Sequence, residues 1–191
     1  MLDNALIVMA LEEECAGLST RMDVLVTGVG KVNAAMALTK RLAAQPPPAL
    51  VLNIGTAGGL SVAPGIVVNA TRFVQRDMEV TALGFERWQT PFEPAGALEN
   101  GLRIESLPEV MCGTGDSFEV GGVAAPYEIV DMEAYALAKV AAAFNVTFAC
   151  LKYISDGASE TAAADWRAAL NACGDTLSEA LETIRRRAKP A

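Results

Sequence analysis

The chain has 191 residues, of which 52% are apolar and 20% charged, and this balance suits one globular domain over residues 1–191. The formal net charge of −8 argues against nucleic acid and anionic membranes as partners, because Lys and Arg hold both. The sequence contains no histidine, which excludes Ser–His and Cys–His nucleophiles and His-ligated zinc. Acid–base chemistry would therefore depend on carboxylates, Lys, Tyr or Cys.

The sequence shows no pattern of a targeting signal and no CxxC pair of cysteines. The first residues lack the basic pattern of a leader, and no apolar run approaches the roughly 20 residues that span a bilayer. The four cysteines are dispersed without a CxxC pair, so we expect reduced thiols at Cys15, Cys112, Cys150 and Cys173. These features predict a cytoplasmic protein.

Short apolar runs alternate with stretches of helical periodicity, which is typical of a wound α/β sheet. Strands are predicted over 5–9, 24–27, 50–54, 65–80, 102–111, 128–131 and 147–154, and helices over 31–42, 133–144 and 163–187. The stretch 83–100, rich in Gly, Pro and aromatic residues, is interpreted as a loop excursion. The strand over 147–154 is almost wholly apolar, as expected where helices cover both faces of a sheet.

A first glycine motif, Gly28-Val29-Gly30-Lys31, follows the second predicted strand. A dinucleotide fingerprint would need glycine where the chain has Asn33, and a P-loop would need it where the chain has Leu25. Two interpretations remain open: a tight strand-to-helix turn, or a turn whose amides face a ligand.

The second motif, Asn53 to Leu60, places three glycines directly after a buried strand. Glycine lets the backbone approach a ligand closely, and open α/β sheets bind ligands at the carboxyl ends of their strands. This motif therefore predicts part of a binding site.

Acidic residues also follow the predicted strands, at 12–14, at 131–133 and at Asp156. An acid at a helix start is commonly a cap worth about 1 kcal/mol or less, which would explain each of them taken alone. Three such groups converging beside a glycine segment instead favour a carboxylate-based active site.

Seven short motifs occur in the order seen in the nucleoside phosphorylase/nucleosidase superfamily. They lie at 10–14, 28–32, 53–59, 77–85, 115–118, 130–134 and 154–156. Within that superfamily the chain most resembles the 5′-methylthioadenosine/S-adenosylhomocysteine nucleosidases, over most of residues 5–185. The resemblance implies a three-layer αβα sandwich around a central mixed, mostly parallel twisted sheet, with no cofactor or metal.

The implied reaction is hydrolysis of the N-glycosidic bond of a 5′-substituted adenine nucleoside, a small-molecule substrate, in methionine salvage. Asp156 matches the acid that protonates N7 of adenine, Glu14 the base that activates water, and Glu133 the carboxylate that holds the ribose. The other implied substrate-binding residues are Thr56, Ala57, Gly58, Phe118 against the purine, Glu119 through its main chain, Asp131, Met132 under the sugar, and Ser155.

Assembly as a homodimer is a further implication. Val80, Leu83, Phe85 and Pro91 match residues that a neighbouring subunit contributes to the pocket for the 5′-substituent. An exposed loop containing Phe85, Trp88 and Phe92 would be costly to leave in water, which favours the same interpretation.

The chain also departs from the superfamily pattern. A hairpin is predicted to be missing between Leu18 and Val24, and the segment 101–111 to be shortened. Lys152 replaces an arginine, Thr56 a serine, and Glu119 an apolar residue. These departures leave three alternatives open: a phosphorylase, a futalosine-type hydrolase, and a protein that binds a purine nucleoside without cleaving it.

A phosphorylase is the nearest rival to a hydrolase, but it would need cationic donors for the bound phosphate. The positions before the glycine segment are Asn53 and Ile54 where an arginine is usual, and Lys31 is the cation near the first glycine turn. Water is therefore the favoured nucleophile.

Overall fold

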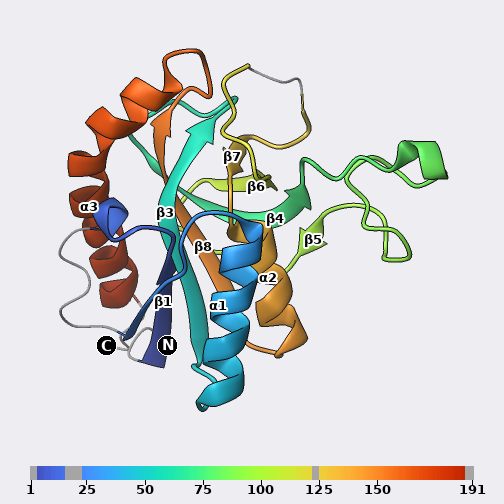
Figure 1. The fold of residues 1–191 in the computed structure, drawn as a ribbon. Coiled ribbons are helices and arrows are strands. Elements are labelled where there is room, and N and C mark those ends of the chain that lie inside the picture. Colours follow the sequence, from blue (N-terminus) through green and yellow to red (C-terminus); the bar gives the residue numbers. More distant parts are fainter. Residues whose placement is uncertain (1–3, 16–22, 122–124, 188–191) are drawn as a thin grey trace.

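The computed structural model describes residues 4–15, 23–121 and 125–187, and Figure 1 shows a central sheet with helices on its two faces. The strands are β1 (Ala5–Met9), β2 (Asp23–Val26), β3 (Leu50–Gly59), β4 (Val67–Gln75), β5 (Leu98–Glu99), β6 (Glu109–Thr114), β7 (Ile129–Asp131) and β8 (Phe148–Asp156). The helices are α1 (Lys31–Ala44), α2 (Ala134–Ala143) and α3 (Ala162–Arg187), with short 3₁₀ helices η2 (Glu12–Cys15) and η3 (Thr81–Leu83).

The sheet is mixed and mostly parallel, as the sequence predicted. Its order is β2-β1-β3-β7-β6-β4-β5, and β8 pairs with both β3 and β4. The strands β3, β8, β4, β6 and β7 therefore form a closed ring, since β7 returns to pair with β3. The pairs β3–β7, β4–β5 and β4–β8 are antiparallel, and the remaining pairs are parallel.

Two apolar cores lie on opposite faces of the sheet and give the three-layer architecture. Leu38 and Leu42 of α1 and Leu137 of α2 pack on one face, and Leu177 and Leu181 of α3 pack on the other. Figure 1 shows the same division, with α1 and α2 on one side and α3 on the other. The predicted fold class is confirmed.

The strand β3 is longer than the apolar run that predicted it. It continues through the glycine motif to Gly59, so these glycines belong to the strand and not to a turn after it. The ladder with β8 pairs Thr56 with Tyr153 and, beyond an irregularity, Gly58 with Asp156. This register brings the glycine motif beside the acid at the end of β8.

The predicted strand over 102–111 is wrong in its first half. Strand β6 begins at Glu109, directly after Pro108, which has no backbone N–H for a ladder. The side chains of Leu102, Ile104 and Leu107 still pack against the core beneath α3, so their apolar character reports burial and not strand pairing.

The segment between β4 and β6 forms the expected loop excursion and projects from the body of the molecule in Figure 1. It contains η3 and the two-residue strand β5. The predicted loss of a hairpin falls mainly on residues 16–22, outside those that the structure describes. No helix among the described residues is long and apolar enough to cross a membrane.

Candidate active site

A cavity of about 210 Å³ lies where β3, β7 and β8 end near η2. All the residues predicted as catalytic or substrate-binding line it: Glu14, Glu133 and Asp156, with Thr56, Ala57, Gly58, Phe118, Glu119, Asp131, Met132 and Ser155. The fold thus gathers side chains from both ends of the chain into one site. Their individual roles stay predictions.

Glu14 is held in a fixed orientation by backbone and side-chain donors. Its Oε1 accepts hydrogen bonds from the Thr56 backbone N–H at 3.1 Å and from the Thr56 hydroxyl at 2.5 Å, and Oε2 accepts a long one of 3.4 Å from the N–H of Leu11. Gly55 permits this approach, because a Cβ at its position would lie 3.3 Å from Oε2 and its φ of +156° lies outside the usual range of L-residues.

Asp156 lies buried at the end of β8. Its Oδ2 accepts a hydrogen bond from the Ser155 hydroxyl at 2.7 Å, and its Oδ1 accepts one from the N–H of Ala158 at 2.9 Å. Gly58 leaves room beside it, since a Cβ there would lie 3.0 Å from Oδ1. The carboxyl group is therefore fixed in a wall of the cavity, as a proton donor to a bound base requires.

Glu133 precedes α2 and reaches across to the first glycine turn. Its Oε1 accepts a hydrogen bond of 2.8 Å from the N–H of Gly30. Burial and the neighbouring Asp131 carboxylate raise the pKa of Glu133 to about 7, and Lys152 and the Gly30 N–H only partly oppose this. Near neutral pH, Glu133 can therefore both bind and release a proton.

The raised pKa makes Glu133 a source of pH-dependent stability. Between the usual glutamate pKa of 4.5 and about 7, the folded state retains a proton that the unfolded state has released. Its contribution is complete below pH 4.5 and is lost as the pH rises through 7, so the free energy of unfolding falls over that interval. We expect Glu133→Gln to flatten this decline, measured by urea unfolding at pH 5, 6, 7 and 8.

The control for this experiment is Glu160→Gln, which removes an exposed carboxylate in the turn before α3. That variant should retain the decline of the unmodified protein. Equal pH dependence of the unmodified protein and Glu133→Gln would contradict the assignment of this titration to Glu133.

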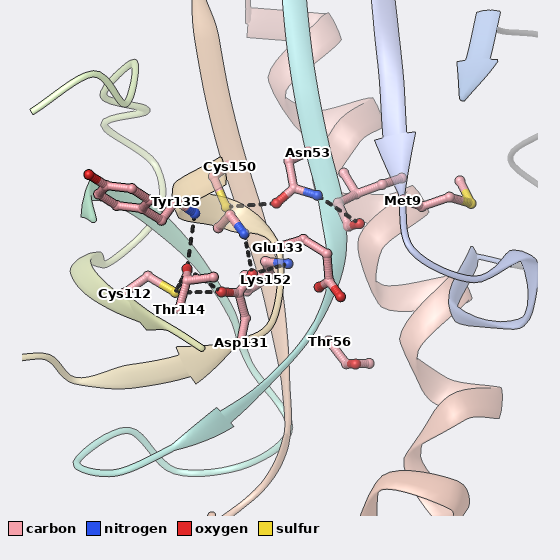
Figure 2. A network of polar contacts seen from close by, with 12 residues as sticks. Met9, Asn53, Thr56, Cys112, Thr114, Asp131, Glu133, Tyr135, Cys150 and Lys152 are labelled. Atoms are coloured by element: carbon pink, nitrogen blue, oxygen red, sulfur yellow. Dashed lines mark hydrogen bonds and ion pairs between the residues drawn. The ribbon is translucent and has the colours of Figure 1, made fainter. Parts of the chain in front are cut away.

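Asp131, which lines the cavity, also belongs to a polar network (Figure 2). Its Oδ2 lies 2.9 Å from Nζ of Lys152 and accepts the N–H of Ala134, and its Oδ1 accepts the Thr114 hydroxyl at 2.6 Å. Although burial acts in the opposite direction, the Lys152 ammonium lowers the pKa of Asp131. Burial alone would lower the pKa of Lys152, but the Asp131 carboxylate outweighs burial and raises it. The pair stays charged and anchors the start of α2 beside Glu133.

The first glycine turn donates its amides to the protein's own carboxylates. The N–H of Gly30 donates to Glu133, and the N–H of Lys31 donates to Asp116 Oδ1 at 2.8 Å. The Lys31 ammonium lies 2.5 Å from Asp77 Oδ1 and 3.9 Å from Asp116 Oδ2. A helix N-terminus is a common phosphate site, but here carboxylates already occupy the N–H groups of Gly30 and Lys31.

The cavity lining also includes an aromatic ring and an ion pair. Phe118 is about half exposed, as a ring available to stack on a planar base would be. Glu119 Oε2 lies 3.2 Å from Nη1 of Arg76, and Arg76 also donates to the hydroxyl and carbonyl of Ser117. Arg76 therefore neutralises the acidic side chain that replaces an apolar residue at position 119.

Arg76 and Trp166, which lie outside the seven sequence motifs and were not predicted, also line the cavity. Arg76 directly follows β4, where a cation after a strand is a weak signal, and its partner Glu119 lies 43 positions further along the chain. Trp166 lies in α3, where helical periodicity indicates only a packed face. Neither position carries a local motif.

The residues predicted to complete a partner's pocket lie elsewhere. Val80, Leu83, Phe85 and Pro91 belong to the excursion after β4 and are not among the residues that line this cavity. The ring of Phe85 packs edge-on against Phe92, with 5.2 Å between centroids, and Phe92 is 94% exposed.

The fold and the cavity agree with comparisons to known proteins. The 5′-methylthioadenosine/S-adenosylhomocysteine nucleosidase of Haemophilus influenzae (strain PittEE) is 35% identical over 156 residues, covering 70% of this chain and 67% of that protein. The protein of the same name from Geobacillus kaustophilus (strain HTA426) is 32% identical, covering 82% of this chain and 86% of its own length.

Among solved structures, a futalosine hydrolase mutant of Helicobacter pylori strain 26695 has a TM-score of 0.85 at 21% identity, covering 96% of this chain and 98% of its own. That likeness shows the shared fold. A model of the phosphorylase superfamily matches residues 18–187. The chain therefore belongs to the phosphorylase superfamily, together with its 5′-methylthioadenosine/S-adenosylhomocysteine nucleosidases.

Proposed function

We propose that the protein hydrolyses the N-glycosidic bond of a 5′-substituted adenine nucleoside and releases adenine and the free sugar. The candidate substrates are 5′-methylthioadenosine, S-adenosylhomocysteine and 5′-deoxyadenosine. The observation that carries the proposal is the meeting of Glu14, Glu133 and Asp156 in one cavity. A reaction of this kind serves methionine salvage in the cytoplasm, where we expect the protein to act.

Each carboxylate has a task in the proposed mechanism. The Asp156 carboxyl donates its proton to N7, so adenine leaves as a neutral molecule while the C1′–N9 bond breaks. Glu14 accepts a proton from water, whose oxygen forms the new bond to C1′. The Glu133 carboxylate orients the ribose hydroxyls and stabilises the positive charge that develops on the sugar. General acid and general base steps each contribute about 10²- to 10⁴-fold.

Water is the proposed nucleophile in preference to phosphate. The amides of Gly30 and Lys31 and the ammonium of Lys31 already contact carboxylates, as described above. Arg76, which lines the cavity, is paired with Glu119. A phosphate dianion would have to displace these carboxylates or lie beside them, at an electrostatic cost.

The deciding experiment is a nucleoside screen with the purified protein. It would measure released base from 5′-methylthioadenosine, S-adenosylhomocysteine, 5′-deoxyadenosine, inosine and futalosine, each with and without phosphate. We expect adenine release from 5′-substituted adenine nucleosides at rates that do not depend on phosphate. Strict dependence on phosphate would indicate a phosphorylase, hypoxanthine release from futalosine alone a futalosine hydrolase, and binding without release a non-catalytic protein.

We further propose that the active form is a two-fold homodimer. The cavity of about 210 Å³ is smaller than the roughly 300–1,000 Å³ of typical ligand pockets. We therefore propose that residues of a partner subunit supply the remaining walls of the pocket. An apolar strip begins at Val29, which lines the cavity, and continues along α1 at Val32 and Met36, both more than half exposed. We propose that the excursion of the partner subunit, with its exposed Leu83 and Phe92, covers this strip.

Phe85→Asp is expected to weaken dimerisation and adenine release together. Burying an aromatic side chain contributes about 1.5–3 kcal/mol, and a buried unpaired carboxylate opposes association further. Sedimentation and activity would be measured at the same protein concentrations. Phe85→Leu, which stays apolar, and Ala95→Asp, which adds the same charge to the same excursion, are the controls. A fully active monomer would contradict the proposed dimer.

A further inference from the structure

A chain of hydrogen bonds connects α3 with Glu14. The indole Nε1–H of Trp166 donates to the Thr56 hydroxyl oxygen at 3.0 Å, and the Thr56 hydroxyl donates to Oε1 of Glu14 at 2.5 Å. Trp166 and Thr56 are 110 positions apart in the sequence, so this contact exists only in the folded protein. All three residues line the cavity.

The direction of this chain follows from the chemistry of its members. An indole N–H only donates, an ionised carboxylate only accepts, and a threonine hydroxyl has a single proton. Because Trp166 occupies a lone pair of the Thr56 oxygen, the hydroxyl proton is directed to Glu14. Hydrogen bonds in such a series polarise one another, so the indole strengthens the bond that Glu14 receives.

The two carboxylate oxygens of Glu14 therefore have different hydrogen-bond partners. Oε1 accepts both the hydroxyl and the backbone N–H of Thr56, whereas among the residues that the structure describes the one donor to Oε2 is the N–H of Leu11, at 3.4 Å. Oε2 therefore retains the capacity to accept a hydrogen bond from water. Rotation of the carboxylate would exchange the two oxygens, and the bonds from Thr56 oppose that rotation.

A second contact ties the same segment to α3. The thiol of Cys173, fully buried, donates to the backbone carbonyl of Glu14 at 2.9 Å. The helix thus holds the main chain of Glu14 through Cys173 and its side chain through Trp166 and Thr56.

We infer that Trp166 is a positioning residue for the general base: through Thr56 it fixes the Glu14 carboxylate with Oε2 available to the attacking water. The inference rests on the proposed hydrolytic function, in which Glu14 activates that water. Trp166 acts through Thr56 and needs no contact with the reacting atoms.

The first test is a kinetic double-mutant cycle. Trp166→Phe keeps an aromatic ring and removes the N–H, and it should lower kcat by about 3- to 10-fold, as loss of one hydrogen bond predicts, with KM changed less than twofold. Thr56→Val removes the hydroxyl that links the two residues. In the Thr56→Val protein, Trp166→Phe should have no further effect on kcat.

Thr56→Ser is the matched control, because it keeps the hydroxyl and loses only a methyl group. In that background Trp166→Phe should lower kcat by the same factor as in the unmodified protein. Thermal unfolding of every variant identifies loss of folded protein, which would lower kcat equally in the Thr56→Val and Thr56→Ser backgrounds.

A spectroscopic measurement tests the contact without turnover. The sequence has two tryptophans, so Trp88→Phe leaves Trp166 as the single indole emitter. Thr56→Val in that protein should shift the wavelength of the emission maximum, and Thr56→Ser should leave it unchanged.

Two results would overturn the inference. One is additive effects of Trp166→Phe and Thr56→Val on kcat in an active enzyme, and the other is an emission maximum that does not change in the Thr56→Val protein. An unmodified protein that releases no adenine would overturn the proposed function and the inference with it.

Discussion

Asp156→Asn is expected to lower kcat for adenine release by about 10²- to 10⁴-fold while the protein stays folded. An amide has nearly the shape of the carboxyl group but cannot transfer a proton to N7. Its oxygen can still accept the N–H of Ala158, and its NH₂ can face the Ser155 hydroxyl, which is able to accept. The loss should therefore fall on proton donation and not on packing.

Adenine release at saturating nucleoside measures this effect, and circular dichroism checks the fold. Asp165→Asn is the matched control, because Asp165 is an exposed carboxylate in α3 that also accepts a hydroxyl, from Thr161 at 2.7 Å. That variant should keep full activity. Unchanged turnover in a folded Asp156→Asn protein would remove Asp156 from the mechanism.

Glu14→Gln should also lower kcat by about 10²- to 10⁴-fold, because the amide cannot accept a proton from water. Its oxygen can replace Oε1 as the acceptor for both donors on Thr56. The cavity should therefore keep its shape. Titration with a non-hydrolysable nucleoside analogue should show binding within a few-fold of the unmodified protein.

The neighbouring Glu13 provides the control for this variant. Glu13→Gln makes the same change of charge in the same 3₁₀ helix at an exposed position, and it should leave kcat unchanged. If Glu14→Gln unfolds the protein while Glu13→Gln does not, the interpretation of Glu14 as a residue that stabilises the helix start is favoured. Unchanged kcat in a folded Glu14→Gln protein would contradict its proposed role as a base.

The sequence predicted the central elements of the fold because their patterns coincide with their burial. The run 147–154 indicated a strand buried on both faces, and β8 is buried along its whole length. The same pattern failed at 102–108, where apolar side chains reach the core from an irregular segment. Apolar spacing reports which side chains are buried, and only the backbone of a neighbouring strand decides whether a ladder forms.

The residues of the candidate site were likewise predicted only in part. Residues within ordered motifs, such as Glu133 after β7 and Asp156 at the end of β8, were predicted from the chain and lie in the cavity. The contacts that hold Glu119 and Thr56 were not predicted, because the ion pair of Arg76 with Glu119 and the bond from Trp166 to Thr56 join segments distant in the sequence. Such pairings depend on how distant segments pack in the folded chain, and no local pattern around Arg76 or Trp166 indicates a partner.

The closed ring of strands has a consequence for the order of folding. Strand β8 inserts between β3 and β4, and its Ser155 meets Ala57 from 98 positions earlier in the chain. Contacts of such long sequence separation form slowly, because the chain between them must first be ordered. Until β8 is in place, β3 and β4 each present an unpaired edge that can associate with other chains. Because β8 also ends in Asp156, the proposed proton donor reaches the cavity in the same step that pairs the open edges of β3 and β4.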